Sequence, residues 1–274
     1  MPDNETQKNL EPQNDYARLA DELGQALREA GPIALKTFRG TIRSWTKGRD
    51  SPVSEADIAV DQFLHERLSR EGYGWLSEES KDDRARLSSE RLFIVDPIDG
   101  TRSYLAGLPD WTIVAAVVEK GRPVAAAVYA PIDDDLYLAA AGQGATRNGE
   151  SIATSGGTGL AHARIAGPKK VLERLTIIDP ATIQEPKIHS LALRMTRVAE
   201  GRIDAAFASV NAYDWDLAAA DLLVHEAGGV MTNFTGETLV YNLHDPVHGA
   251  ILAAGRSRHN AMLELVRARH KEFA

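Results

Sequence analysis

Phe93-Ile94-Val95-Asp96-Pro97-Ile98-Asp99-Gly100-Thr101 joins an apolar run to two acids, a glycine and a hydroxyl. Such a run, ended by proline and glycine, predicts a buried β-strand that leads into a tight turn. Burying an ionised carboxylate is unfavourable unless a cation meets it, and Arg102 is the only basic residue that follows closely. We therefore expect Asp96 and Asp99 to bind a divalent cation.

The composition is that of an ordinary globular protein. Its 274 residues, 43% of them hydrophobic, suffice for one large domain or two smaller ones. The absence of cysteine excludes disulfides and thiolate metal sites and fits a reducing cytoplasm, where we place the protein. No apolar run reaches membrane-spanning length, so we expect no membrane insertion.

The net charge of −8 argues against a nucleic-acid polymer as partner. It is compatible with a small phosphorylated substrate, because a bound metal ion can reverse the local field.

The pattern of helices and strands predicts an α/β (α+β) protein in two parts. Residues 1–14 are polar and are expected to be a disordered leader. Residues 15–150 should form an α+β metal-binding sub-domain, with a helix near each of residues 15–36 and 54–70 and an antiparallel sheet after residue 110. The Gly/Ser/Thr-rich stretch 149–159 marks the boundary, and residues 151–274 should form a C-terminal α/β sub-domain.

More acids lie at the ends of predicted elements. Glu78-Glu79 follows a short strand, Asp216 opens an apolar helix, and Asp57 lies in the first turn of another helix. Loops at such ends gather to form sites in α/β proteins. Oxygen ligands without His or Cys favour Mg²⁺ or Mn²⁺ over zinc.

Each of these additional acids also has a purely structural interpretation. Asp57 completes a capping box with Ser54, and Asp216 is an acid favoured by a helix N-terminus. Glu78-Glu79 fits an exposed acidic turn. The spacing alone leaves these alternatives open.

Four motifs, in order between about residues 50 and 230, resemble those of the inositol monophosphatase family of metal-dependent phosphatases. They are Ser51 to Asp57, Trp75 to Ser80, Asp96 to Thr101, and Trp215-Asp216 with the helix that ends at Gly228-Gly229. The resemblance implies a layered α-β-α-β-α sandwich of the sugar-phosphatase type, a homodimer, and sensitivity to lithium.

The resemblance also implies roles for individual residues. Glu78, Asp96 and the Ile98 carbonyl would hold one Mg²⁺. A second ion would be held by Asp96, Asp99 and Asp216. A third, weaker ion would lie near Glu78 and Glu79, and Mn²⁺ would be able to substitute.

Catalytic roles are implied for Asp57, Glu79 and Thr101. Substrate contacts are implied for Gly100, Thr101, Arg102, Ser209 and Asp216, with the Gly100 and Thr101 amides facing the phosphate. Two metal ions and in-line geometry suit direct attack by an activated water without a phosphoenzyme.

The substrate is less closely defined. Inositol-selective members carry a glutamate seven residues before the motif aspartate, whereas Ser209 occupies that position here. The stretch from Trp111 to Pro131 favours the 3′(2′),5′-bisphosphate nucleotidase branch. Arg102 and Lys169-Lys170 are candidates to meet a second phosphate.

The favoured substrate is therefore 3′-phosphoadenosine 5′-phosphate. Inositol 1-phosphate and histidinol phosphate are the alternatives, and a non-catalytic regulatory or binding member of the family is the alternative of another class.

Overall fold

The computed structural model describes residues 4–48 and 51–273. Its larger sheet has seven strands in the order β3-β4-β5-β6-β7-β8-β9. The first two strands are parallel and every other neighbouring pair is antiparallel. The strands are β3 (Tyr73–Ser77), β4 (Arg91–Asp99), β5 (Thr112–Glu119), β6 (Arg122–Ala130), β7 (Asp135–Ala140), β8 (Ala145–Arg147) and β9 (Glu150–Ser151).

Helices α1 (Asn4–Leu35) and α2 (Glu55–Leu68) cover one face of this sheet. Leu19, Leu23 and Leu27 lie on one side of α1, as its apolar spacing predicts, and are fully buried in the core with the inward side chains of β4 and β5. This layer brings α2, with Asp57 in its first turn, to the acid-bearing end of β4.

Helix α1 begins at Asn4, where a disordered leader over residues 1–14 was predicted. The stretch from Asn4 to Glu11 is rich in helix-forming Glu, Gln, Lys and Leu and contains no glycine, so it extends the helix expected from Asp15. Residues 1–3 lie outside the described residues.

The smaller sheet has five strands in the order β11-β10-β12-β16-β14. Strands β10, β11 and β12 are parallel, and β16 pairs antiparallel with β12 and β14. The bounds are β10 (Arg164–Ala166), β11 (Ile183–Gln184), β12 (Ala205–Ala208), β14 (Gly229–Asn233) and β16 (Ile251–Gly255).

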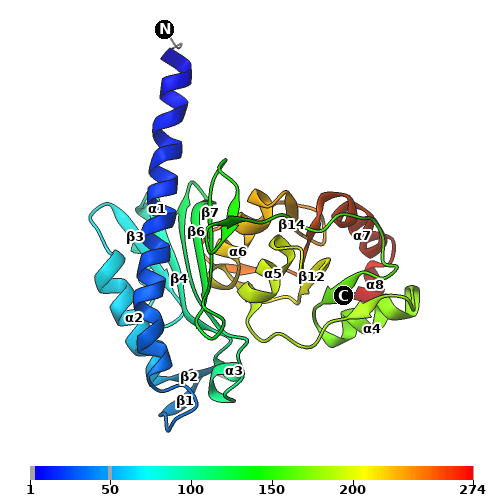
Figure 1. Cartoon of the computed structure of the whole chain (residues 1–274), viewed down its shortest axis with the longest axis horizontal. Helices are drawn as coiled ribbons and strands as arrows, with labels where there is room; N and C mark the ends of the chain where they lie inside the picture. Colours follow the sequence, from blue (N-terminus) through cyan, green and yellow to red (C-terminus); the bar gives the residue numbers. More distant parts are fainter. Residues whose placement is uncertain (1–3, 49–50, 274) are drawn as a thin grey trace.

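Two helices, α5 (Leu191–Ala199) and α6 (Asp214–Glu226), are sandwiched between the sheets. Helices α4 (Lys169–Ile178), α7 (Arg256–Ala268) and α8 (His270–Phe273) lie beyond the smaller sheet. The layers follow one another across Figure 1 as helices, sheet, helices, sheet, helices. The predicted α-β-α-β-α sandwich is confirmed.

The proposed boundary after residue 150 falls within β9, the last strand of the larger sheet. One core cluster spans both parts, because Ile94 and Val114 of the larger sheet pack with Leu217 and Leu223 of α6. The division into two sub-domains stays a prediction.

Short elements complete the chain: the hairpin β1 (Ser44–Lys47) and β2 (Ser51–Ser54), the turn helix η1 (Ala85–Ser88), α3 (Thr101–Leu105), and the pair β13 (Ala212–Tyr213) and β15 (Val247–His248). Within residues 4–48 and 51–273, none of the helices combines the length and the apolar character that crossing a bilayer requires.

Candidate active site

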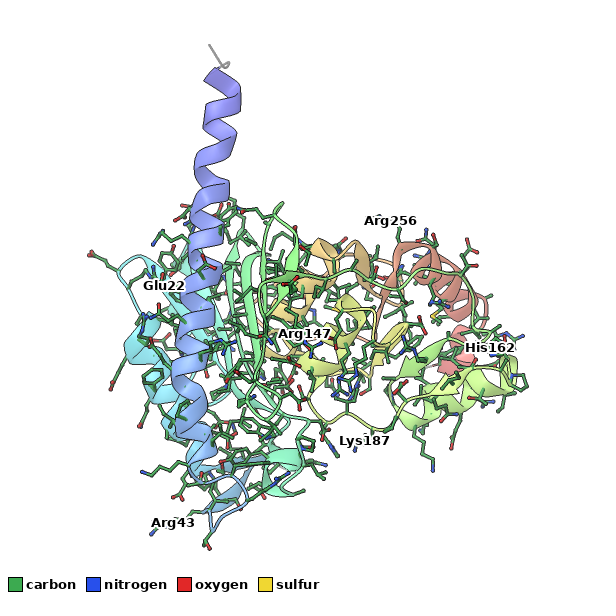
Figure 2. The ribbon with its side chains drawn as sticks, viewed as in Figure 1. Glu22, Arg43, Arg147, His162, Lys187 and Arg256 are labelled. Atoms are coloured by element: carbon green, nitrogen blue, oxygen red, sulfur yellow. The ribbon has the colours of Figure 1, made fainter. Side chains whose placement is uncertain are left out.

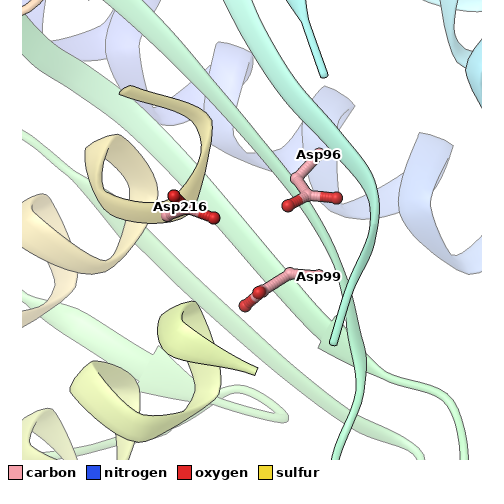
Figure 3. A group of neighbouring side chains, drawn as sticks. All are labelled: Asp96, Asp99 and Asp216. Carbon is pink, nitrogen blue, oxygen red and sulfur yellow. The ribbon is translucent and has the colours of Figure 1, made fainter. Parts of the chain in front are cut away.

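Three aspartates from two distant segments of the chain meet between the larger sheet and α6. Asp96 and Asp99 lie at the end of β4, and Asp216 lies in the first turn of α6. Each offers a carboxylate oxygen, and these oxygens all lie within 4.8 Å of one another. Figure 3 shows the three side chains close together, with Asp96 and Asp99 on the strand and Asp216 at the start of the helix that faces it.

An irregularity in β4 lets two aspartates three residues apart reach the same place. In a regular strand, such residues would point to opposite faces of the sheet. Between Asp96 and Asp99, however, three steps along β4 correspond to two along β5, from Val114 to Thr112. The resulting bulge, which includes Pro97, redirects the strand and its side chains.

Asp96 is the least satisfied of the three. Its Oδ1 accepts a hydrogen bond from the amide of Ile98 at 3.1 Å, and only 1% of the residue is exposed. Its Oδ2 is buried and accepts no hydrogen bond from the described residues. A buried carboxylate oxygen in this state requires a cation or a proton.

Asp99 is held by the start of α5. Its Oδ2 accepts hydrogen bonds from the Ser190 hydroxyl at 2.5 Å and the Ala192 amide at 2.7 Å, while its Oδ1 accepts from the Leu191 amide at 3.1 Å. A carboxylate at a helix N-terminus interacts favourably with the helix dipole. No signal in the sequence identified Ser190 as a partner of Asp99.

Asp216 combines the structural and the functional interpretation. Its Oδ2 accepts a hydrogen bond from the Tyr213 amide at 2.7 Å, which is a helix-capping contact. The carboxylate nevertheless reaches the oxygens of Asp96 and Asp99. The capping contact therefore fixes the side chain in the orientation that a metal ligand would need.

Glu78 and Glu79 lie beside Lys47. The Lys47 Nζ is 2.7 Å from Glu79 Oε1 and 3.7 Å from Glu78 Oε1, and it donates a hydrogen bond to the Glu78 carbonyl. The Glu79 side chain is only 1% exposed, so these residues are not the exposed acidic turn that was one alternative. Nothing in the sequence identified Lys47 as their partner.

Burial and mutual repulsion favour the protonated forms of this cluster. Burial raises the pKa of Asp96 well above its ordinary value, and the neighbouring carboxylates of Glu78 and Asp99 raise it further. The same two causes raise the pKa of Asp216, with Asp99 the main neighbour. Burial raises the pKa of Glu78 to about 7, although Lys47 opposes the shift. A cation bound here would therefore displace protons.

Asp57 likewise serves two purposes. Its Oδ2 accepts hydrogen bonds from the amide and hydroxyl of Ser54, which form the capping box at the start of α2. Its Oδ1 accepts a hydrogen bond from the Thr101 hydroxyl at 3.1 Å. That hydroxyl also lies 3.1 Å from the Ile98 carbonyl oxygen.

Gly100 forms the turn between β4 and α3. Its φ of 95° lies in the left-handed region, and a Cβ there would come within 3.0 Å of the Asp110 carbonyl oxygen and 3.1 Å of the Ser190 amide. A side chain at this position would be strained and would push the turn away from α5.

Most of these groups line a cleft of about 1030 Å³, whereas Asp57 and Glu79, for which catalytic roles were expected, are not among its lining residues. Glu78 and the three clustered aspartates line one part of it, and Ser209 lines another. The cleft also has basic lining residues: Lys47, Arg102, Lys187 and His189. Figure 2 shows Lys187 on the loop before α5.

Sequence reasoning did not identify Lys47, Lys187 or His189 as residues of the site. It suggested Lys169-Lys170 instead, and neither of these lysines lines the cleft. Lys47 ends strand β1, and Lys187 and His189 lie in the loop before α5. None of the three belongs to a recognisable motif, so their position at the site depends on the fold. Lys169 instead lies 3.7 Å from Glu173 on its own helix.

The residues fit a hard divalent cation. The ligand atoms are carboxylate oxygens, with no histidine or cysteine in the cluster, and one buried Asp96 oxygen has no hydrogen-bond donor within the part of the chain that the structure describes. Hard cations prefer such oxygen donors.

Comparisons with known proteins agree with this site. The family described as "Inositol monophosphatase family" matches residues 14–271. An inositol-1-monophosphatase of Rhizobium meliloti is 32% identical over 232 residues, covering 80% of this chain and 86% of that protein. The Nus factor SuhB of Salmonella typhimurium is 31% identical, covering 77% of this chain and 84% of that protein.

Among solved structures, the extragenic suppressor protein SuhB of Bartonella henselae superposes with a TM-score of 0.78 at 29% identity, covering 90% of this chain and 97% of that one. With a family match over nearly the whole length and a candidate acidic metal site within it, this chain belongs to the inositol monophosphatase family, whose members are phosphatases that hydrolyse phosphate monoesters.

Proposed function

We propose that this cleft hydrolyses a small phosphate monoester with the help of Mg²⁺. The observation that supports the proposal most is the cluster itself: Asp96, Asp99 and Asp216 each offer a carboxylate oxygen within 4.8 Å of the others, and the buried Asp96 Oδ2 accepts no hydrogen bond from the described residues. The family to which the chain belongs is metal-dependent. The identity of the ion as Mg²⁺, with Mn²⁺ able to substitute, is part of the proposal.

Two Mg²⁺ ions would be held by overlapping sets of ligands. Glu78, Asp96 and the Ile98 carbonyl would bind the first. Asp96, Asp99 and Asp216 would bind the second. A third ion would lie near Glu78 and Glu79. Bound ions of this kind lower the pKa of water and neutralise charge on the phosphoryl oxygens.

The Thr101–Asp57 pair would orient the attacking water. Thr101 directs its hydroxyl proton toward Asp57 and the Ile98 carbonyl, so the lone pairs of its oxygen are available to accept a hydrogen bond from water. Asp57 is held in turn by Ser54, which keeps the pair in one arrangement. The amides of Gly100 and Thr101 would bind the phosphate, and Glu79 would assist from its ion pair with Lys47.

Two substrates remain candidates. Relatives named inositol-1-monophosphatase support inositol 1-phosphate. The basic residues Arg102, Lys187 and His189 on the cleft wall, with the short Ser209 where a glutamate would select inositol, support 3′-phosphoadenosine 5′-phosphate. The same assay would include histidinol phosphate.

Release of inorganic phosphate from each candidate tests the proposal, with Mg²⁺ or with EDTA. We expect Mg²⁺-dependent turnover of at least one compound and none in EDTA. Turnover that persists unchanged in EDTA would contradict it.

The names of several relatives, Nus factor SuhB, support a second candidate of another class, a regulatory or binding protein. Folded protein that binds Mg²⁺ but hydrolyses none of the candidate monoesters would favour that function. Lithium inhibition, a homodimer and a cytoplasmic location are further parts of the proposal, and light scattering of the purified protein tests the dimer.

A further inference from the structure

A second cavity, of about 760 Å³, adjoins the proposed catalytic cleft. Ser209 lines both spaces, and Val210 continues from it along the wall of the second one. This second cavity is called the side pocket below. A ligand bound by its phosphate in the cleft therefore has a neighbouring space within reach.

The fold places the side pocket where ligands commonly bind. Strands β10 and β12 are parallel, so their carboxyl ends lie at the same edge of the smaller sheet. Pro168 follows β10 and Ser209 follows β12, and both line the side pocket. The crevice outside the carboxyl ends of parallel strands is the usual ligand site of open α/β sheets.

The lining of the side pocket is mainly apolar. Val171, Ala208 and Val266 form buried parts of its surface. Phe234 forms a further part, and its ring packs edge-on against Phe207 with centroids 6.0 Å apart, which holds it in place. The catalytic cleft, by contrast, is lined by acids and bases.

The rim of the side pocket is polar and partly basic. Lys170 and Arg267 line it, together with Glu272. Val210, at the side shared with the cleft, is 61% exposed and adds accessible apolar surface there. An apolar group attached to an anionic substrate matches both the lining and the position.

We propose that the side pocket binds the alcohol part of the substrate, and that this part carries a flat apolar ring. The inference rests on the proposed function, because the phosphate must occupy the cleft. It selects among monoesters: a ring with apolar faces, such as a nucleobase or a phenyl group, fits the side pocket, whereas a polyhydroxylated ring leaves the apolar lining unmatched.

Two alkyl esters that differ only in a ring test the inference: ethyl phosphate and 2-phenylethyl phosphate. Their leaving groups are both simple primary alcohols, so a difference in kcat/KM reports binding of the ring. With Mg²⁺ present, we expect the phenylethyl ester to have the higher kcat/KM by about tenfold or more, mainly through a lower KM.

Variants of residues that line the side pocket test whether the preference for the phenylethyl ester arises there. Phe234→Ala removes an aromatic wall and should bring the ratio of the two kcat/KM values close to one. Ala250→Leu, which narrows the pocket instead of emptying it, should lower the ratio as well and guards against a folding defect in the first variant. Ile177→Ala is the matched control: Ile177 is 71% exposed and lines neither cavity, so the ratio should not change.

Equal kcat/KM values for the two esters, or a ring preference that survives both pocket variants, would overturn the inference. Calorimetric binding of the phosphonate analogues of the two esters separates this outcome from failure of the proposed function. Ring-dependent binding that Phe234→Ala abolishes, without turnover of any ester, would refute phosphatase activity but support the side pocket. Turnover without any ring dependence would support the activity and refute the pocket assignment.

Discussion

Two buried aspartates, Asp204 at the smaller sheet and Asp96 at the larger one, differ in whether cationic side chains neutralise them. Asp204 precedes β12, accepts a 2.6 Å hydrogen bond from Ser155, and lies 3.5 Å from Arg164 and 3.6 Å from Arg258. These partners outweigh its burial and lower its pKa. Burial raises the pKa of Asp96, and none of the ion pairs among the described residues includes it.

This difference in ion pairing distinguishes a carboxylate that the chain neutralises with its own arginines from one that it leaves without a cationic partner. Arginine partners make Asp204 a structural acid, whose charge stabilises the folded protein. At the end of β4 the neighbours of Asp96 are further acids. Placing such acids together lowers the stability of the folded protein unless a bound cation neutralises them. Their clustering therefore indicates a functional site.

The largest effect is expected for Asp96→Asn. The substitution keeps the shape but removes the charge that both metal ions would share, so phosphate release should fall by about a thousandfold or more, roughly 4 kcal/mol in the barrier. Turnover measured at saturating Mg²⁺, with circular dichroism to check the fold, tests this. Activity within tenfold of wild type would remove Asp96 from the site.

Thr101→Val should have the next largest effect. Valine keeps the size of threonine but removes the hydroxyl that donates to Asp57, so kcat should fall by about a hundredfold, within the usual range for loss of a proton-positioning group. Ser54→Ala is the comparison variant: it weakens the helix cap of α2 by about 1 kcal/mol and removes one hydrogen bond that holds Asp57, but it leaves the Thr101 hydroxyl in place, so kcat should fall less. Equal kcat losses in the two variants would assign Asp57 to capping alone.

Asp204→Asn should show the converse behaviour. It leaves Arg258, which is 6% exposed, without its charged partner, so the free energy of unfolding should fall by about 2 kcal/mol. Phosphate release per folded molecule should stay near that of wild type, since Asp204 lines neither cavity. Urea unfolding and an activity assay, run on the same sample, check the expected loss of stability and the unchanged activity. An unchanged free energy of unfolding would contradict the structural role assigned to Asp204.

A smaller effect is expected in the pH dependence of metal-free protein. The folded pKa of Glu78, about 7, exceeds its ordinary 4.5, so the folded state binds the extra proton. Stability should therefore fall as pH rises from about 4.5 to 7, and Tm in EDTA should be lower by a few degrees at pH 7.5 than at pH 5. Glu78→Gln should flatten that part of the curve, and a Tm that rises across this interval in EDTA would show that the acids are already neutralised within the chain.

The sequence was informative about the site where the chemistry is local. The apolar run into Asp96 and Asp99 predicted a strand that ends in acids, and β4 has that form. The apolar helix after Asp216 predicted a buried element, which α6 is. The layer order came from the family resemblance, since periodicity alone does not say which sheet a helix covers.

What the sequence could not supply depends on long-range packing. Lys47 lies in a hairpin far from Glu79 in sequence, and Ser190 caps a helix while holding Asp99. Neither residue belongs to a recognisable sequence motif, because the fold brings each one to a partner that is distant in the sequence. The helical start of α1 reflects local propensity that the polar composition of residues 4–14 obscured.

Calorimetric titration with Mg²⁺ tests the central claim most directly, carried out on wild type, Asp96→Asn and Asp204→Asn in two buffers of different ionisation enthalpy. The account predicts saturable binding to wild type with release of protons and with affinity that rises between pH 5 and pH 7, because the raised pKa values of the cluster make protons compete with the ion. Asp204→Asn should bind in the same way and Asp96→Asn should lose this binding. Wild-type protein that binds no Mg²⁺, or an Asp96→Asn variant that binds it unchanged, would contradict the account.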